Sequence, residues 1–123
     1  MNPMPQIAVI GAGIAGLSCA VVLQKAGLKT RVFEKSGGPS GRMSTRRGDD
    51  WQCDHGAQYF TARHPDFRAE VARWRQAGVA GSWAPKLQVI GQQPLGNSDQ
   101  SLERFVGIPR MTAPAHFLSE ALA

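Results

Sequence analysis

The residues with the clearest chemical potential are three glycines near the start of the chain. Gly11, Gly13 and Gly16 are spaced as glycine-x-glycine-x-x-glycine, directly after a run of apolar residues. In a strand-turn-helix unit the first glycine permits a tight turn, the second lets the backbone approach a pyrophosphate, and the third lets the helix pack closely on the strand. The free N–H groups at the start of the helix attract phosphate oxygens. The segment therefore predicts a diphosphate site. Its expected contacts are Gly11, Ala12, Gly13, Ile14, Ala15 and Gly16.

An acidic side chain stands at the distance where such a site needs one. Glu34 follows Gly16 by eighteen residues and ends the stretch TRVFE, residues 30–34, which predicts a second strand. A carboxylate in that place accepts hydrogen bonds from ribose hydroxyl groups. Because it would repel a 2′-phosphate, the sequence favours FAD or NAD over NADP.

The apolar pattern predicts the elements that must position these residues. Residues 6–10 are mostly apolar without alternation, which predicts a short strand buried on both faces. Apolar residues at helical spacing then predict a helix that reaches Ala26 and is ended by Gly27. Residues 30–34 predict a second strand. This order is one βαβ unit, and it indicates an α/β fold.

A glycine-rich loop that ends in an arginine follows Glu34. Residues 35–42 read KSGGPSGR and lead into Met43. Such a loop can cross over a pyrophosphate, where a planar guanidinium binds phosphate oxygens well. It can equally be a surface connection with a solvated arginine. On the first interpretation the contacts from this region are Lys35, Gly41, Arg42 and Met43.

Cys53, Asp54 and His55 place a thiol, a carboxylate and an imidazole at consecutive positions. Neighbouring residues of a strand point to opposite faces, so three of them cannot converge on one ion, and no metal site is predicted. His55 could contact a cofactor or substrate, or it could be a structural histidine. Cys19 and Cys53 have neither disulfide nor zinc spacing; we expect both to be small buried residues of a protein in a reducing compartment.

Charge and hydropathy limit the expected partners. The net charge is +5, and between residues 42 and 75 basic and acidic residues alternate, which is typical of a solvated surface. No nucleic-acid-binding module accompanies them. Residues 7–23 carry no charge, but glycines interrupt them and no basic residue precedes them, so they predict neither a signal peptide nor a membrane span. We expect a cytoplasmic protein without a nucleic-acid or membrane partner.

Three motifs carry a resemblance to a known family. They are GAGIAGLSCAVVLQKAGLKTRVFEKS at residues 11–36, SGRMST at 40–45 and DHGAQYF at 54–60. Together they are similar to the FAD-dependent flavin amine oxidase superfamily, and within it to the bacterial renalase-like proteins. The similarity continues more weakly through HPDFRAEVARW, GSWAP and RFVGIPRM. One departure is the pair Ser40-Gly41, where the superfamily more often has two glycines.

The resemblance implies that FAD is the cofactor. It also implies that Gly56, Ala57, Gln58 and Tyr59 form a backbone turn beside the flavin ring. The implied reaction oxidises a reduced nicotinamide dinucleotide, a misreduced isomer, and oxygen then reoxidises the flavin to give hydrogen peroxide. No catalytic acid or base of this chain is required. The alternatives are an amine oxidase or a desaturase acting on another small molecule, or a noncatalytic nucleotide-binding fragment.

The second half of the chain predicts further helices and short strands. Residues 65–77 predict a helix with an apolar stripe that includes Trp74, and Thr112 is expected to cap a last helix. Trp83 and Phe105 could line a substrate pocket or belong to the core. Short strands are expected at residues 82–83, 87–90 and 104–108.

The expected organisation has two parts. Residues 1–63 are assigned to an FAD-binding portion, and residues 64–123 to the start of a substrate-side helical and β region. A single βαβ unit leaves its parallel strands with too few neighbours to cover both faces. The predicted fold class is therefore α/β, a Rossmann-type FAD-binding βαβ unit followed by the beginning of an α+β substrate domain, in a chain that is interpreted as truncated.

Overall fold

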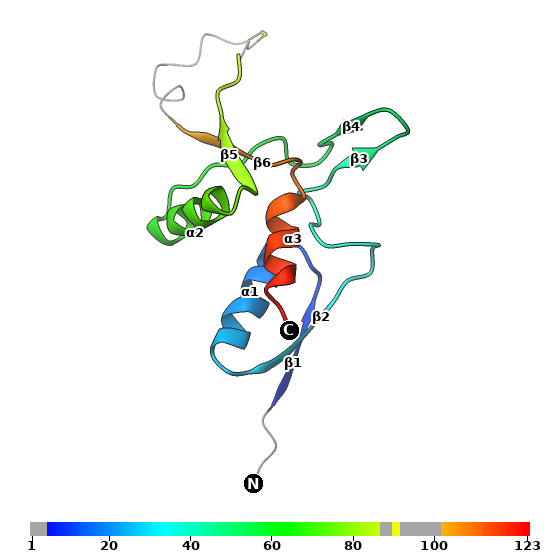
Figure 1. Cartoon of the computed structure of the whole chain (residues 1–123), viewed down its shortest axis with the longest axis vertical. Helices are drawn as coiled ribbons and strands as arrows, with labels where there is room; N and C mark the ends of the chain where they lie inside the picture. Colours follow the sequence, from blue (N-terminus) through cyan, green and yellow to red (C-terminus); the bar gives the residue numbers. More distant parts are fainter. Residues whose placement is uncertain (1–4, 87–89, 92–101) are drawn as a thin grey trace.

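The first part of the chain forms the predicted βαβ unit. The computed structural model describes residues 5–86, 90–91 and 102–123. Strand β1 (Gln6–Ile10), helix α1 (Ile14–Lys25) and strand β2 (Lys29–Phe33) follow one another, and α1 lies along the two strands (Figure 1). The strands are parallel and in register from the Gln6 and Lys29 pair to the Ile10 and Phe33 pair. The three predicted elements are confirmed, with β2 starting and ending one residue earlier than expected.

The prediction that β1 is buried on both faces is wrong. Exposed and half-buried residues alternate along both strands. Val32 of β2 packs against the core, whereas the exposed fraction is 82% for Ile10 and 50% for Phe33. The two-stranded sheet therefore has one covered face, towards α1, and one open face. The apolar run at residues 6–10 is typical of a strand that is buried on both faces, but in the described residues only one face of the sheet is covered.

Helix α1 packs through a narrow set of residues. Leu17, Ala20 and Val21 are buried, and Lys25 lies in the last turn, where a positive charge interacts well with the helix dipole. Gly27 follows the C-cap with φ +80°, so the predicted glycine stop is confirmed. The uncharged run at residues 7–23 is divided between β1 and α1, and no helix in the described part of the chain has the length and apolarity to cross a membrane.

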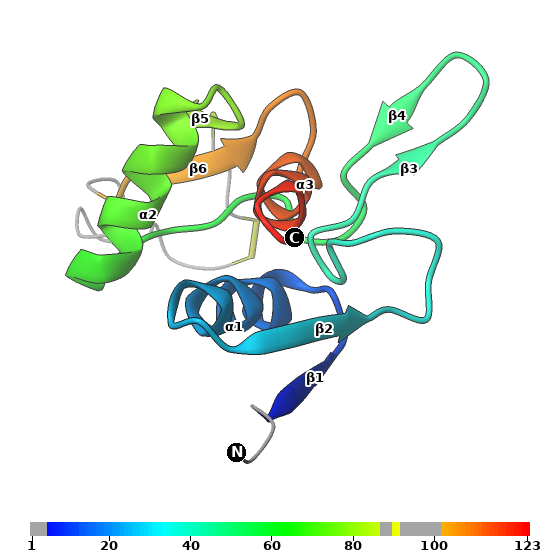
Figure 2. The ribbon, with the colours of Figure 1, turned by 60° about the horizontal axis from the view of Figure 1, so that its bottom comes forward.

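Two antiparallel strand pairs follow the βαβ unit. Strands β3 (Arg46–Arg47) and β4 (Gln52–Cys53) form a short hairpin that the sequence did not predict and that projects from the rest of the chain (Figures 1 and 2). Strand β5 (Ala80–Trp83) pairs with β6 (Arg104–Gly107), which confirms two of the expected strands with slightly different ends. Of the expected strand at 87–90, residues 87–89 lie outside the described residues.

Helix α2 (Pro65–Gln76) and the β5/β6 pair share an aromatic core. Trp74 is 1% exposed, and its ring meets the Phe60 ring edge-on at 5.9 Å between centroids. Phe60 stacks on Phe105 at 5.7 Å and exchanges two backbone hydrogen bonds with it, of 2.9 and 2.8 Å. Phe105 is therefore a core residue, whereas Trp83 is 40% exposed.

Helix α3 (Ala113–Glu120) returns to the βαβ unit and packs against α1 (Figure 2). Pro114, Ala115 and Leu118 are buried on its inner side. Thr112 stands at the N-cap position as expected, but its side chain accepts no capping hydrogen bond there, because its backbone is already helical. The last helix thus supports the first one, although about ninety residues separate them.

Candidate dinucleotide-binding site

The glycine-rich turn joins β1 to α1 with the close backbone approach that its spacing predicts. Gly11 has φ +98° and donates its N–H to the carbonyl oxygen of Phe33 at 2.7 Å, which ties the turn to the end of β2. A β-carbon at Gly16 would collide with the carbonyl oxygen of Gly11. The helix can therefore begin this close to the strand only with glycine at position 16.

The start of α1 presents backbone N–H groups that have no partner within the helix, next to open space. The first helical hydrogen bond runs from the Leu17 N–H to the Gly13 oxygen at 3.0 Å, so the N–H groups of Ile14, Ala15 and Gly16 precede the helical bonding pattern. A β-carbon at Gly13 would meet no atom within 4 Å. Donors, the positive end of the helix dipole and an unobstructed approach therefore coincide at Gly13, and this combination suits an anionic diphosphate.

Glu34 connects the turn to the loop that follows β2. Its Oε2 accepts the Ala12 N–H at 2.7 Å, and its Oε1 accepts the Ser36 N–H at 2.9 Å. These hydrogen bonds, that of Ser36 foremost and that of Ala12 next, hold the pKa of the Glu34 carboxyl below its ordinary value. The carboxylate is therefore ionised at neutral pH, and it retains lone pairs that can accept hydroxyl groups.

The loop after Glu34 lies against the glycine-rich turn. Ser40 donates its N–H to the Ala12 oxygen at 2.9 Å and forms a parallel bridge with Gly13. A β-carbon on the following Gly41 would stand 3.3 Å from the Cα of Gly13. Ser40 is 7% exposed and has φ +129°, a backbone conformation that favours glycine. This gives a physical reason for the commoner glycine at that position in the resembling superfamily.

The third motif is hydrogen-bonded to the same loop. Ala57 donates its N–H to the Arg42 oxygen at 2.9 Å, and the Gly56 N–H reaches the Ser44 oxygen at 3.4 Å. A β-carbon at Gly56 would collide with the Arg42 oxygen and would stand 2.6 Å from the Ser44 Oγ. Backbone contacts thus link the three segments in series: residues 11–16 meet 40–41, and residues 42–44 meet 56–57.

The side chains of the remaining predicted residues are distributed around this backbone. Lys35, Arg42 and Gln58 are exposed, and Met43 is half-buried. The exposed Tyr59 ring lies 6.0 Å from the Trp83 ring, and the Arg104 guanidinium stands 5.4 Å from the Tyr59 centroid. The structure therefore gathers the backbone of the predicted site, while it records no side-chain contact that joins Arg42 to Tyr59.

The side chains of the Cys-Asp-His cluster differ in their partners and exposure. Asp54 accepts hydrogen bonds from Thr45 and Met111, whereas His55 is exposed. In the described ranges no three His, Cys, Asp or Glu side chains are grouped so that they could hold a metal ion. Cys19 and Cys53 are exposed, so the expectation that both are buried is wrong; Cys53 lies on the projecting hairpin. Sequence reasoning also missed the backbone links through Ser36 and Ser44, because no side-chain pattern encodes them.

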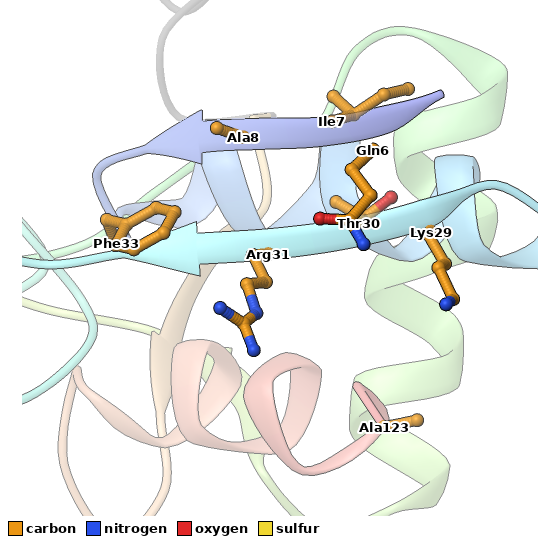
Figure 3. Close-up of a pocket in the computed structure, with 8 residues that line it drawn as sticks. All are labelled: Gln6, Ile7, Ala8, Lys29, Thr30, Arg31, Phe33 and Ala123. Atoms are coloured by element: carbon orange, nitrogen blue, oxygen red, sulfur yellow. The ribbon is translucent and has the colours of Figure 1, made fainter. Parts of the chain in front are cut away.

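Two pockets lie near the βαβ unit. One, of about 240 Å³, stands at the Glu34 end of the site, with Pro39 and Val32 among its lining residues. The other, of about 510 Å³, runs along β1 and β2 and contains none of the predicted contacts. Figure 3 shows Lys29 and Arg31 extending from β2 into this second region. The larger hollow is therefore separate from the candidate diphosphate site.

The fold and the site together define a dinucleotide-binding protein of the Rossmann type. Residues 9–74 match the family described as NAD(P)-binding Rossmann-like domain. This match covers more than half of the chain, and the chain belongs to that family.

Known relatives match only part of their own length. A tRNA 5-methylaminomethyl-2-thiouridine biosynthesis bifunctional protein from Magnetococcus marinus is 39% identical over 83 residues, which are 58% of this chain and 12% of the relative. An L-amino-acid oxidase from Crotalus adamanteus is 36% identical over 73 residues, 59% of this chain and 14% of the relative. A solved structure of wild-type putrescine oxidase bound to putrescine is 31% identical with a TM-score of 0.50, and the match covers 65% of this chain and 18% of that chain.

Proposed function

We propose that this chain is the cofactor-holding part of an FAD-dependent oxidoreductase. The observation that carries the proposal is the hydrogen-bonded series of three motifs, which gathers the backbone donors at the start of α1, a fixed carboxylate and glycine-lined space along one path. An extended FAD needs these features in the order carboxylate, donors and open space, because its diphosphate lies between the adenosine ribose and the flavin ring. The resemblance of the same motifs to flavin amine oxidases favours FAD over NAD.

The residues have distinct roles in this proposal. The backbone of residues 11–16 lies against the diphosphate. The donors are the N–H groups at the start of α1, because those of Gly11 and Ala12 already donate to Phe33 and Glu34. Glu34 accepts the ribose hydroxyl groups beside Lys35. Gly41, Arg42 and Met43 cover the diphosphate from the loop. Residues 56–59 lie beside the flavin ring, where Gly56 and Ala57 leave space for close contact. A flavin held by these residues would supply the redox chemistry, oxidation of a small molecule with oxygen as the electron acceptor.

Two substrate classes are supported by different observations. Oxidation of an amine or an amino acid is supported by the similarity to putrescine oxidase and to L-amino-acid oxidases. Oxidation of a misreduced nicotinamide dinucleotide is supported by the renalase-like character of the three motifs. The division into a cofactor portion at residues 1–63 and the start of a substrate-side region at 64–123 belongs to the same proposal. A noncatalytic nucleotide-binding role is the remaining alternative.

The test is FAD binding by the intact protein that contains this chain. We expect it to purify with a visible flavin absorbance that resists dialysis. The substitution Gly13→Ala should weaken FAD binding while the thermal unfolding of the apoprotein stays unchanged, because its β-carbon meets no protein atom but enters the space left for the diphosphate. A protein that binds no flavin, or a Gly13→Ala variant with unchanged affinity, would contradict the proposal. Hydrogen peroxide release with putrescine, L-amino acids or misreduced nicotinamide dinucleotides then separates the substrate classes.

A further inference from the structure

Asp54 joins two segments that are far apart in the sequence. It is half-buried, and its Oδ1 accepts both the Thr45 hydroxyl at 2.6 Å and the Met111 N–H at 3.1 Å. Thr45 lies between the Arg42 loop and β3, and Met111, which is fully buried, precedes α3.

These two bonds fix the base of an otherwise exposed hairpin. All four strand residues of β3 and β4 are exposed, so packing contributes little to holding the hairpin in place. Asp54 directly follows β4, and it stands two residues before Gly56. Its partner Thr45 stands directly after Ser44, whose carbonyl oxygen accepts the Gly56 N–H. The Asp54 carboxylate therefore holds together the two ends of the segment that connects the 42–44 loop to the 56–57 turn.

The link also reaches α1 through α3. Met111 is held by Asp54 at the start of the segment that becomes α3, and α3 packs against α1. The N-terminus of α1 is the proposed diphosphate site. The Asp54 carboxylate thus connects the 56–57 turn, which would lie beside the flavin ring, to α3 and through it to α1, whose N-terminus would bind the diphosphate.

We infer that Asp54 is a positioning residue for the bound flavin. It sets the place of the 56–57 backbone relative to the 42–44 loop, so that the turn can contact the ring, and it does so without touching the cofactor itself. The inference rests on the proposed function, because Asp54 can position the turn for a flavin only if a flavin binds beside the turn. It also explains why an acid stands within the Cys-Asp-His stretch although no metal or acid-base role uses it.

The test compares Asp54 variants of the intact protein in FAD titrations of the apoprotein. Asp54→Ala removes the oxygen that accepts both bonds and leaves the buried Met111 N–H unpaired, so we expect FAD to bind at least about tenfold more weakly. Asp54→Asn keeps an oxygen that can accept both bonds, and its affinity should stay within about threefold of the wild type. Thr45→Val removes one donor and should fall between the two. Asp50→Ala, which removes the same charge from an exposed position of the same hairpin, is the matched control and should match the wild type.

The visible spectrum of the bound flavin separates positioning from general stability. At saturating FAD, Asp54→Ala should shift the flavin absorbance band, because the turn beside the ring has moved, whereas Asp50→Ala and Asp54→Asn should not. If Asp54→Ala lowers the melting temperature of the apoprotein but leaves the affinity and the band unchanged, the positioning role is overturned and the proposed function survives. If Asp54→Ala does not fold, an unchanged affinity and band in Thr45→Val overturn the role. A wild-type protein that binds no FAD overturns both proposals.

Discussion

The substitution Gly56→Ala tests whether the third motif is held against the Arg42 loop by its backbone. The added β-carbon would collide with the Arg42 oxygen and press on the Ser44 Oγ. Overpacking of this kind costs about 1–3 kcal/mol. Moving the turn away also weakens the hydrogen bond from Ala57 to Arg42, worth about 1 kcal/mol, while the longer one at 3.4 Å adds little. We therefore expect the free energy of unfolding to fall by about 2–4 kcal/mol.

The assay for this prediction is urea unfolding of the apoprotein, followed by circular dichroism. Gly37→Ala is the matched control: its β-carbon meets nothing within 4 Å, and its backbone is not in the left-handed region. That variant should be unchanged or more stable by up to about 1 kcal/mol, since alanine restricts the unfolded chain. Equal unfolding midpoints for Gly56→Ala and Gly37→Ala would refute the close approach of the turn to the loop.

Three further predictions concern the loop and the carboxylate. Ser40→Gly should raise the free energy of unfolding by about 1 kcal/mol in the same assay, because the strain of φ +129° is relieved; a loss of stability would speak against that backbone conformation. The pKa of Glu34 is lowered in the folded protein, so its stabilising contribution is fully present above the ordinary value of 4.5 and is lost as the pH falls through the folded pKa. The difference in free energy of unfolding between the wild type and Glu34→Gln should therefore become smaller in acid. A difference that stays constant with pH would contradict this. Arg42→Ala should weaken FAD binding about tenfold with an unchanged melting temperature of the apoprotein. Arg46→Ala, at another exposed arginine, should leave both the affinity and the melting temperature unchanged; equal affinities of the two variants would contradict a role of Arg42 in FAD binding.

The sequence predicts the βαβ unit well because its signals are local. The glycine spacing, the apolar run before it and the Gly27 stop each act within a few residues, and all appear in the structure as expected. The helix at Pro65 is likewise encoded by its proline and its apolar stripe. Burial of β1 was predicted wrongly, because burial depends on which other elements cover the sheet and not on the strand alone.

The links between the motifs could not be predicted from residue types. Ser40 meets Ala12, and Ala57 meets Arg42, through main-chain atoms that every residue carries. The β3/β4 hairpin has strands of two residues each, too short for an alternating pattern to be recognised. The sequence shows that Asp54 carries a carboxylate, but not which groups donate to it. Its two donors, Thr45 and Met111, are brought to it by the fold, and Met111 lies 57 positions away in the sequence.

The central claim is that the backbone of residues 11–16 binds the diphosphate of FAD while Glu34 holds its ribose. A crystal structure of the intact protein with its cofactor tests this claim most directly. We expect diphosphate oxygens within hydrogen-bond distance of the N–H groups at the start of α1, ribose hydroxyl groups on the Glu34 carboxylate, and the flavin ring beside Gly56 and Ala57. A structure in which protein side chains fill the space at Gly13, or in which the cofactor lies elsewhere, would contradict it.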